Sequence, residues 1–238
     1  MSSIKKGTLY LIPSYLSESS GTEVLPPQIS TAVKTTSIYL VENIRTARRY
    51  ISSLKLGITI EELQFFELTK KTSREEIKRL LAPINKGQNI GILSEAGCPG
   101  IADPGALAVE QAHKIQARVV PLTGPSSILL GLMASGLNGQ QFAFQGYLPI
   151  EKGQRVKAIQ SLEKESIKYT RTQIFIETPF RNRQIFDSLL SSCKPETKLC
   201  VAVDITGTTE QIETHSIKDW KKIRWELHKR PTIFLLQG

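Results

Sequence analysis

Cysteine and histidine are scarce in this sequence, with three of each among 238 residues. The cysteines, Cys98, Cys193 and Cys200, form no CxxC pair and no Cys/His zinc spacing, and their odd number argues against a disulfide framework. The histidines are scattered among polar and charged neighbours. We therefore predict reduced thiols, as in a cytosolic protein, and no metal site.

Long apolar runs are also absent. A membrane-spanning helix needs about 18 consecutive apolar residues, and no such run occurs. The N-terminal MSSIKKGTLYLIP lacks the apolar core and the small-residue cleavage site of a secretory signal. Hydrophobic residues nevertheless make up 40% of the chain, so we expect a folded cytoplasmic protein without a membrane segment.

Acidic residues are the minority among the charged ones. The 31 Lys and Arg residues outnumber the 22 Asp and Glu residues, which gives a formal net charge of +9. This excess is compatible with an anionic partner such as RNA, and equally with solvated helix faces that keep the protein soluble. The basic residues are densest in ENIRTARR (42–49), KRL (78–80) and KDWKKIRWELHKR (218–230).

Apolar, β-branched runs alternate with segments of helical period, which is typical of the α/β class with mainly parallel sheets. We predict a division into an N-terminal α/β domain, residues 1–122, and a C-terminal α/β domain, residues 123–238, with a cleft between them. Shorter connections near DITGTTEQIE predict some antiparallel pairing in the second domain. Strands are predicted over 8–13, 37–42, 64–68, 89–94, 118–122, 142–148, 172–177, 198–205 and 232–237, and helices over 43–54, 73–84, 104–115, 125–137, 155–166 and 181–192.

The glycine-rich loop SEAGCPGIADPG (94–105) directly follows the apolar run NIGIL. Its glycines fit neither GxxxxGK[ST] nor GxGxxG, and no lysine lies between Lys86 and Lys114. Glu95 and Asp103 would repel a polyphosphate, whereas a ligand with hydroxyls, an ammonium group and a cationic centre would be favoured. S-adenosylmethionine fits that description. The alternative is a tight loop that is shaped by turn requirements alone.

Motifs in a fixed order extend this loop over some 60 residues. SEAGCP, ADPG, VVPLTGPS, ASGL and GYLP follow one another, and this order resembles the core of the tetrapyrrole (corrin and porphyrin) methylase family. The most similar branch methylates the ribose 2′-hydroxyl of a cytidine in small-subunit ribosomal RNA. Weaker likeness in LYLIPSYL, YLVENIRTARRYISSLKLG, RTQIFIETPFR and VAVDITGTTEQI covers nearly the whole chain. The resemblance implies a class III methyltransferase fold, S-adenosylmethionine in the cleft between two α/β domains, and a homodimer.

The resemblance also implies which residues contact the cofactor. In the second half they are Ile176, Ala202 and Thr232; the first two could equally be ordinary buried strand residues. Ser126 and Ser127 could simply open a helix. The other expected contacts are Pro13, Ser94, Glu95, Ala96, Gly97, Cys98, Ser126 and Ser127.

Several positions depart from the ribosomal RNA branch. Its loop aspartate is Glu95 here, its Glu-Asp-Thr-Arg becomes ENIR (42–45), and the lysine of its Thr-Lys-x-x-Glu becomes Gly207. The chain also ends at TIFLLQG, so we expect no added C-terminal helical module for RNA. Because these changes fall where substrate would bind, methyl transfer is better supported than ribosomal RNA as the acceptor.

Two residues of ENIR are candidates for the chemistry. A ribose hydroxyl is a poor nucleophile until it is deprotonated, so Glu42 is the candidate base or orienting carboxylate and Arg45 the phosphate or substrate clamp. The alternative is a carboxylate at a helix N-terminus and a surface arginine. The acceptor stays open between RNA and a tetrapyrrole or other small metabolite, and a non-catalytic scaffold that binds the cofactor or RNA is a third possibility.

Overall fold

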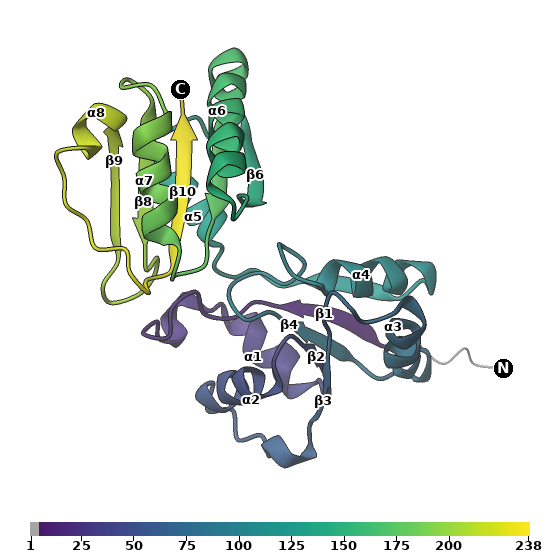
Figure 1. The fold of residues 1–238 in the computed structure, drawn as a ribbon. Helices are drawn as coiled ribbons and strands as arrows, with labels where there is room; N and C mark the ends of the chain where they lie inside the picture. The colour runs from purple at the N-terminus through teal and green to yellow at the C-terminus, as the bar shows by residue number, and fades with distance from the viewer. Residues whose placement is uncertain (1–4) are drawn as a thin grey trace. The chain divides into compact units, whose positions relative to one another are not determined.

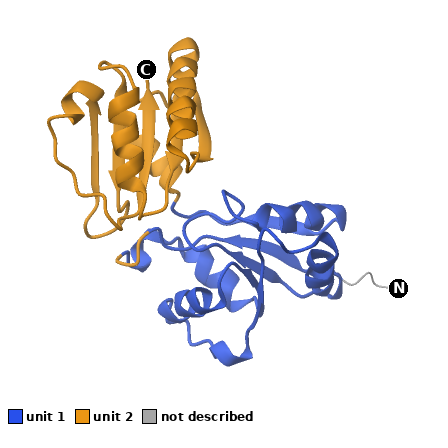
Figure 2. Ribbon diagram, viewed as in Figure 1, with its two compact units in different colours: residues 1–16, 20–125 blue, residues 17–19, 126–238 orange. Residues whose placement is uncertain are grey.

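The computed structural model describes residues 5–238. The chain forms two compact units, residues 1–16 with 20–125 and residues 17–19 with 126–238 (Figure 2). The predicted division into domains 1–122 and 123–238 stays a prediction. Residues 1–4, the start of the segment MSSIKKGTLYLIP for which no secretory signal is predicted, lie outside the described residues.

The first unit contains a parallel five-stranded sheet of order β3-β2-β4-β1-β5 (Figure 1). The central strands read IYLV and IGIL and are buried along their whole length, as expected for strands covered on both faces. The strands are β1 (Thr8–Ile12), β2 (Ile38–Val41), β3 (Gln64–Glu67), β4 (Ile90–Leu93) and β5 (Arg118–Pro121).

Helices cover both faces of this sheet and produce two apolar clusters. One cluster gathers residues of α3 and α4, and the other gathers residues of α1 and α2. Ser73 Oγ accepts a hydrogen bond of 3.1 Å from Glu76 N, so α3 has the start that S-x-x-E predicts. The helices are α1 (Pro27–Lys34), α2 (Ile44–Ser53), α3 (Arg74–Leu81) and α4 (Gly105–Lys114), with short 3-10 turns η1 (Thr22–Val24), η2 (Ile60–Glu62) and η3 (Ala82–Lys86).

The second unit contains a mixed sheet of order β6-β7-β10-β8-β9. Only β6 and β7 pair in parallel, and the other three pairings are antiparallel. The predicted antiparallel pairing near DITGTTEQIE is therefore confirmed. The strands are β6 (Phe142–Tyr147), β7 (Thr172–Ile176), β8 (Lys198–Val203), β9 (Gln211–Ser216) and β10 (Thr232–Gln237).

Alternate residues of β10 build the core on the two faces of this sheet. Gly131 of α5 lies over one face, where a Cβ atom would stand 3.2 Å from Ile233 Cγ2. On the other face Phe234 stacks on Phe175, with ring centroids 5.8 Å apart, beneath the remaining helices. The helices are α5 (Ser127–Ser135), α6 (Lys152–Tyr169), α7 (Asn182–Ser192) and α8 (Ile217–Trp220).

All of the predicted strands and helices are present, and their ends differ by one to a few residues. The α/β prediction is confirmed. Two α-helices and one strand were missed: α1, α8 and β9.

Candidate cofactor and substrate site

The candidate site lies at the carboxyl edge of the first sheet. The chain leaves β2 toward β3 on one side of the sheet order and leaves β4 toward β5 on the other. The adjacent ends of β2 and β4 therefore form a topological switch point, the usual place for a ligand in a parallel α/β sheet. Glu42 follows β2 and the glycine-rich loop 94–105 follows β4.

The glycine-rich loop is shaped largely by its own hydrogen bonds. Asp103 Oδ1 accepts bonds from Gly100 N (2.7 Å) and Gly105 N (2.8 Å), and Gly97 and Gly100 adopt φ of +70° and +85°. Asp103 Oδ2 is buried and has no hydrogen-bond partner among the described residues. Burial raises the pKa of this carboxyl, although the two backbone bonds oppose the rise. Asp103 therefore holds the loop in shape through its hydrogen bonds and also contributes to its acidic character.

The loops after β1, β4 and β5 pack closely together in the first unit. Ser14 N donates to Gly97 O over 3.0 Å. A Cβ atom on Gly124 would lie 2.2 Å from Pro13 Cβ, so only glycine fits there. Cys98 Sγ lies 3.4 Å from Pro125 O, and burial raises the pKa of its thiol. The structure thus brings the predicted residues Pro13, Gly97 and Cys98 together, with Ser94, Glu95 and Ala96 in the same loop.

Glu42 and Glu95 are linked across the two strand ends. Glu95 N donates to Glu42 Oε1 over 3.1 Å, and Thr46 Oγ1 donates to Glu95 Oε1 over 2.6 Å. The pKa of Glu42 is raised by burial and by the carboxylates of Asp103 and Glu95, against the Glu95 backbone bond and Lys70. The sequence did not single out Thr46, because its partner Glu95 lies 49 residues further along the chain.

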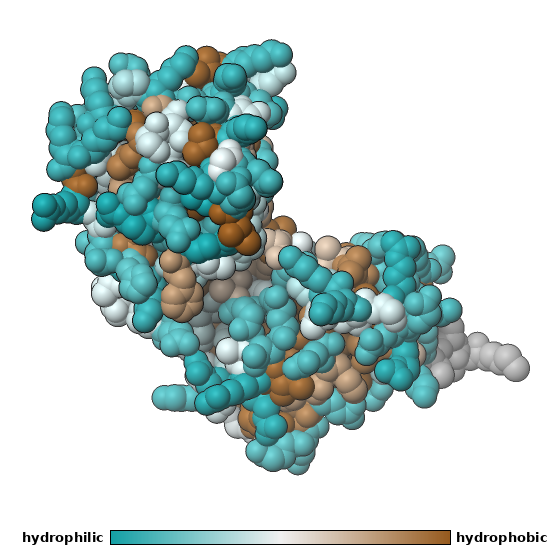
Figure 3. Space-filling view, in the orientation of Figure 1, coloured by the Kyte–Doolittle hydropathy of each residue, from teal (hydrophilic) through white to brown (hydrophobic). Residues whose placement is uncertain are grey.

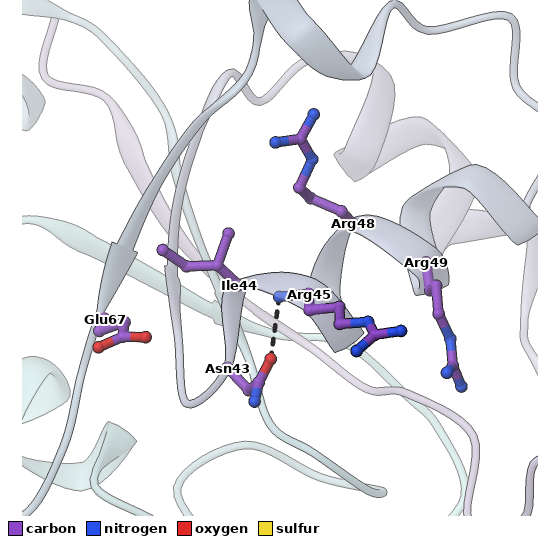
Figure 4. A pocket seen from close by; sticks show the side chains of 6 residues that line it. All are labelled: Asn43, Ile44, Arg45, Arg48, Arg49 and Glu67. Atoms are coloured by element: carbon purple, nitrogen blue, oxygen red, sulfur yellow. Dashed lines mark hydrogen bonds between the residues drawn. The ribbon is translucent and has the colours of Figure 1, made fainter.

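Arginines line an open pocket on α2 beside this link. Asn43 caps the helix, with its Oδ1 accepting from Arg45 N (2.9 Å) and Thr46 N (3.2 Å). The pocket has a volume of about 630 Å³, and the guanidinium groups fan out from the helix in Figure 4. Its lining residues are Asn43, Ile44, Arg45, Arg48, Arg49 and Glu67. Guanidinium groups in this number suit phosphate or carboxylate ligands.

The predicted cofactor residues of the second half belong to the second unit. Ile176 and Ala202 flank Ile233 from opposite sides of the central strand, and Ala202 is fully buried. Thr232 Oγ1 donates to Arg230 O (3.0 Å) and accepts from Asn182 Nδ2 (3.1 Å). Helix α5 begins at Ser127, and Ser126 precedes it without a capping bond from its side chain. Their cofactor contacts, and a cleft that unites both halves, stay predictions.

Asp204, just after β8, was not selected from the sequence. Its carboxylate is buried and accepts bonds from Thr209 Oγ1 (2.5 Å) and Thr209 N (3.2 Å). Burial would raise its pKa, but hydrogen bonds from Thr209 and Ser17 outweigh burial and lower it. The nearby Gly207, where the resemblance expects lysine, would place a Cβ atom 2.4 Å from both Asp204 oxygens.

Neither a metal nor a membrane span is indicated by the described residues. Within residues 5–238 no three His, Cys, Asp or Glu side chains are grouped to hold a metal ion. In the same range no helix is both long and apolar enough to cross a membrane. The face shown in Figure 3 is mainly hydrophilic, with hydrophobic residues scattered over it.

Comparison with known proteins supports the resemblance noted in the sequence. No protein-family model matches the chain. Ribosomal RNA small subunit methyltransferase I of Buchnera aphidicola subsp. Acyrthosiphon pisum is 25% identical over 235 residues, covering 98% of this chain and 79% of that protein. The protein of that name from Mesorhizobium japonicum is 34% identical over 140 residues, or 59% of this chain and 46% of its own length.

Solved structures with a similar fold include tetrapyrrole methylases. The uroporphyrin-III C-methyltransferase of Thermus thermophilus matches with a TM-score of 0.57 at 18% identity, covering 97% of this chain and 92% of its own. The methyltransferase CobJ gives 0.61 at 14% identity, covering 98% and 94%. A further Thermus structure, in complex with S-adenosylhomocysteine, gives 0.56 at 14% identity and covers 98% of each chain.

These matches bear out the predicted fold, and the names of the relatives agree with the predicted enzyme class. The relatives are named as methyltransferases, and one structural neighbour holds the demethylated form of the predicted cofactor. The chain has the tetrapyrrole methylase fold, and its sequence is similar to ribosomal RNA small subunit methyltransferase I.

Proposed function

We propose that this protein is an S-adenosylmethionine-dependent methyltransferase whose acceptor is RNA, and ribosomal RNA in particular. One observation carries the proposal: the carboxyl edge of the first sheet puts an acidic, lysine-free loop beside a pocket lined by three arginines. The loop suits a cationic cofactor without phosphate, and the pocket suits a phosphate-bearing acceptor.

The loop fits S-adenosylmethionine better than a nucleotide phosphate. Carboxylates of Glu42, Glu95 and Asp103 gather at the strand ends, and a cationic ligand would relieve their mutual repulsion. When bound, the cofactor supplies an electrophilic methyl group on a sulfonium. The residues proposed to hold it are Pro13, Ser94, Glu95, Ala96, Gly97, Cys98, Ser126, Ser127, Ile176, Ala202 and Thr232.

Glu42 and Arg45 are proposed to act on the acceptor. Because burial and neighbouring carboxylates raise the pKa of Glu42, its carboxylate is a stronger base than an exposed one, which suits proton removal from a ribose hydroxyl. Arg45 is exposed at the start of α2, where it can hold a phosphate and align the acceptor.

Calorimetry with S-adenosylmethionine tests the cofactor. We expect binding well below about 1 mM, within the usual enzyme range. An absence of heat at that concentration would contradict the whole proposal. Transfer of labelled methyl groups into fractionated cell extract then separates RNA from small molecules as the acceptor.

Arg45→Gln tests the clamp. We expect kcat/KM on RNA to fall by about 10-fold or more, because a charge-assisted contact to phosphate contributes about 1.5 to 3 kcal/mol. Arg79→Gln on α3, whose guanidinium is exposed and pairs with Glu76, is the matched control and should behave as the unaltered protein. Equal rates for both variants would remove Arg45 from the site.

A small anionic metabolite is the second candidate acceptor. The volume of the arginine pocket, about 630 Å³, lies within the range of small-molecule sites. Label found in small molecules, with no salt-sensitive affinity for RNA, would favour it. Cofactor binding without transfer to any fraction would favour a non-catalytic scaffold.

We further propose a homodimer in the cytoplasm, as the family resemblance implies. Sedimentation equilibrium of the purified protein tests the first point, and cell fractionation tests the second. A monomer at tens of micromolar would contradict the dimer.

A further inference from the structure

Two exposed aromatic rings lie at one edge of the second sheet. Tyr147 ends β6 and is 53% exposed, and Phe180 lies in the turn after β7 and is 68% exposed. Because β6 and β7 run in parallel and Tyr147 pairs with Ile176, Tyr147 lies at the carboxyl end of one strand and Phe180 follows the carboxyl end of its neighbour. Single exposed hydrophobic residues are common on protein surfaces. Exposure alone therefore does not indicate a binding role for these two rings, and their surroundings must be considered.

The backbone holds both rings in defined places. The pairing of β6 with β7 shifts between Phe144 and Tyr147, where Gly146 adopts φ +65°; such a bulge redirects the side chain that follows it. Around Phe180, Glu177 Oε1 accepts from Thr178 N over 2.6 Å and from the Arg181 guanidinium. The turn that carries Phe180 is therefore tied at both ends.

A cation stands beside Phe180. Lys229 N donates to Pro179 O over 3.1 Å, and Lys229 Nζ lies 5.9 Å from the centroid of the Phe180 ring, within reach of a cation–π contact. Lys229 also adopts φ +59°, which is uncommon for a residue other than glycine.

Lys229 belongs to a basic loop, residues 221–230, between α8 and β10. Buried Asn182 holds the end of this loop through Nδ2, which donates to Arg230 O (2.6 Å) and Leu227 O (3.4 Å). The exposed basic side chains of the loop are Lys221, Lys222, Arg224, His228 and Lys229. Positive charge thus lies directly beside an exposed ring.

We propose that Tyr147, Phe180 and the basic loop form a binding surface for single-stranded RNA. Bases stack on the two rings, and Lys229 with its neighbours contacts the phosphates. Aromatic platforms flanked by cations are the usual means of holding single strands without reading their sequence. The inference rests on the proposed RNA acceptor and adds to it a surface that the glycine-rich loop and α2 do not provide.

Fluorescence anisotropy of the full-length protein with a labelled single-stranded RNA of about 12 nucleotides, a length within the usual site sizes, tests the surface. For Phe180→Ala we expect an affinity lower by about 5- to 100-fold, with an unchanged slope of log K against log salt. Phe180→Trp should bind as tightly as the unaltered protein. Lys229→Gln should reduce the slope by about 0.7.

Tyr169→Ala is the matched control. This ring is 44% exposed and lies near Lys168 Nζ (4.9 Å) and Arg171 Cζ (5.2 Å), but it precedes the start of β7. It should bind RNA normally. If Phe180→Ala unfolds, by circular dichroism, Tyr147→Ala against Tyr147→Phe gives the same comparison.

Three results would overturn the surface. The first is unchanged RNA affinity in both Phe180→Ala and Tyr147→Ala, as expected if the rings dock a protein instead. The second is an equal loss of RNA affinity in Tyr169→Ala. The third is no RNA affinity in the unaltered protein at any salt concentration. Calorimetry with S-adenosylmethionine in parallel separates these from failure of the proposed function, because cofactor binding does not require the surface.

Discussion

Glu42 lies in an environment that favours its protonated form. Burial and the carboxylates of Asp103 and Glu95 raise its pKa above the ordinary 4.5. A carboxyl group whose pKa is higher in the folded than in the unfolded state binds more protons when the protein is folded. The folded protein therefore loses stability as pH rises from the unfolded-state pKa to the folded-state pKa. Ionisation of Glu42 therefore weakens the fold.

Glu42→Gln should separate activity from stability. The amide can still accept the bond from Glu95 N but cannot remove a proton, so we expect methyl transfer to fall by about 100-fold or more. The free energy of unfolding, from denaturant titration at pH 7, should be unchanged or higher. Between about pH 4 and pH 7 the unaltered protein should lose stability relative to the variant.

Two outcomes would contradict this assignment. Full activity of Glu42→Gln on the true acceptor would exclude the base, and a variant less stable at pH 7 than at pH 4, relative to the unaltered protein, would reverse the sign argued from burial.

Gly207 stands where the resemblance expects a lysine, and Gly207→Ala tests whether the fold tolerates a side chain at this position. The new Cβ atom would meet both Asp204 oxygens at 2.4 Å, and the Asp204 carboxylate is buried and held by Thr209. We expect a loss of about 1 to 3 kcal/mol in the free energy of unfolding. Gly139→Ala, where nothing lies within 4 Å, is the control and should change little. Similar values for the two would show that Asp204 moves aside freely.

Asp103 shows what residue types alone could and could not predict. The residue types alone indicated an acidic, lysine-free loop. They could not show that one Asp103 oxygen closes the loop on Gly100 and Gly105, because that depends on the backbone conformation of the residues between them, where Ala102 adopts φ +63°. Thr46 likewise became relevant only once β2 and β4 were known to be neighbours.

At the scale of elements, Asn182 connects the start of α7 to the chain entering β10. Its Nδ2 donates to Arg230 O, Leu227 O and Thr232 Oγ1, and the residue is fully buried. Asn182→Ala should cost about 1 to 3 kcal/mol, because buried acceptors lose their donor. Amide exchange in residues 226–230 should accelerate.

Gln184→Ala, on the exposed face of the same helix, is the control for Asn182→Ala. It should leave both the unfolding free energy and the exchange rates near their original values. Unchanged exchange in residues 226–230 of Asn182→Ala would mean that Trp225 and Leu227, which are buried, hold the loop without Asn182.

Strongly apolar elements were predictable from the sequence, and polar or short ones were not. The strand β4 (IGIL) and helix α3 (REEIKRLL) follow their hydrophobic periods. The strand β9 reads QIETHS, and its polar residues do not indicate a strand. Pairing with β8 on one side is enough to place it in the sheet. Helix α1 has eight residues and starts at a proline pair. In so short a segment, packing rather than the period of the apolar residues decides whether a helix forms.

At the scale of the whole molecule, the chain builds separate apolar cores in its two units. The sequence predicted two α/β parts from the order of elements, but strand order within each sheet follows from which faces pack together, and that information is not local. The parallel order β3-β2-β4-β1-β5 puts Glu42 beside Glu95, although 53 residues separate them along the chain.

Cofactor binding offers a test that spans both units. If residues of both units contact one S-adenosylmethionine, a concentration 100-fold above Kd should stabilise the protein by about 2.7 kcal/mol. Hydrogen exchange should then slow both in residues 94–98 and near Ala202 and Thr232. Slowing in residues 94–98 alone would confine the cofactor site to the first unit and remove the second-half residues from it.

The strand β9 also bears on how the protein behaves at high concentration. It forms one border of the second sheet, where unpaired backbone groups could recruit a strand from another molecule. Gln211 and Glu213 are exposed along it, and Glu213 pairs with His215 at 2.8 Å. The polarity that hid this strand from sequence analysis is thus a protection against aggregation, and apolar replacements there should lower solubility before they lower stability.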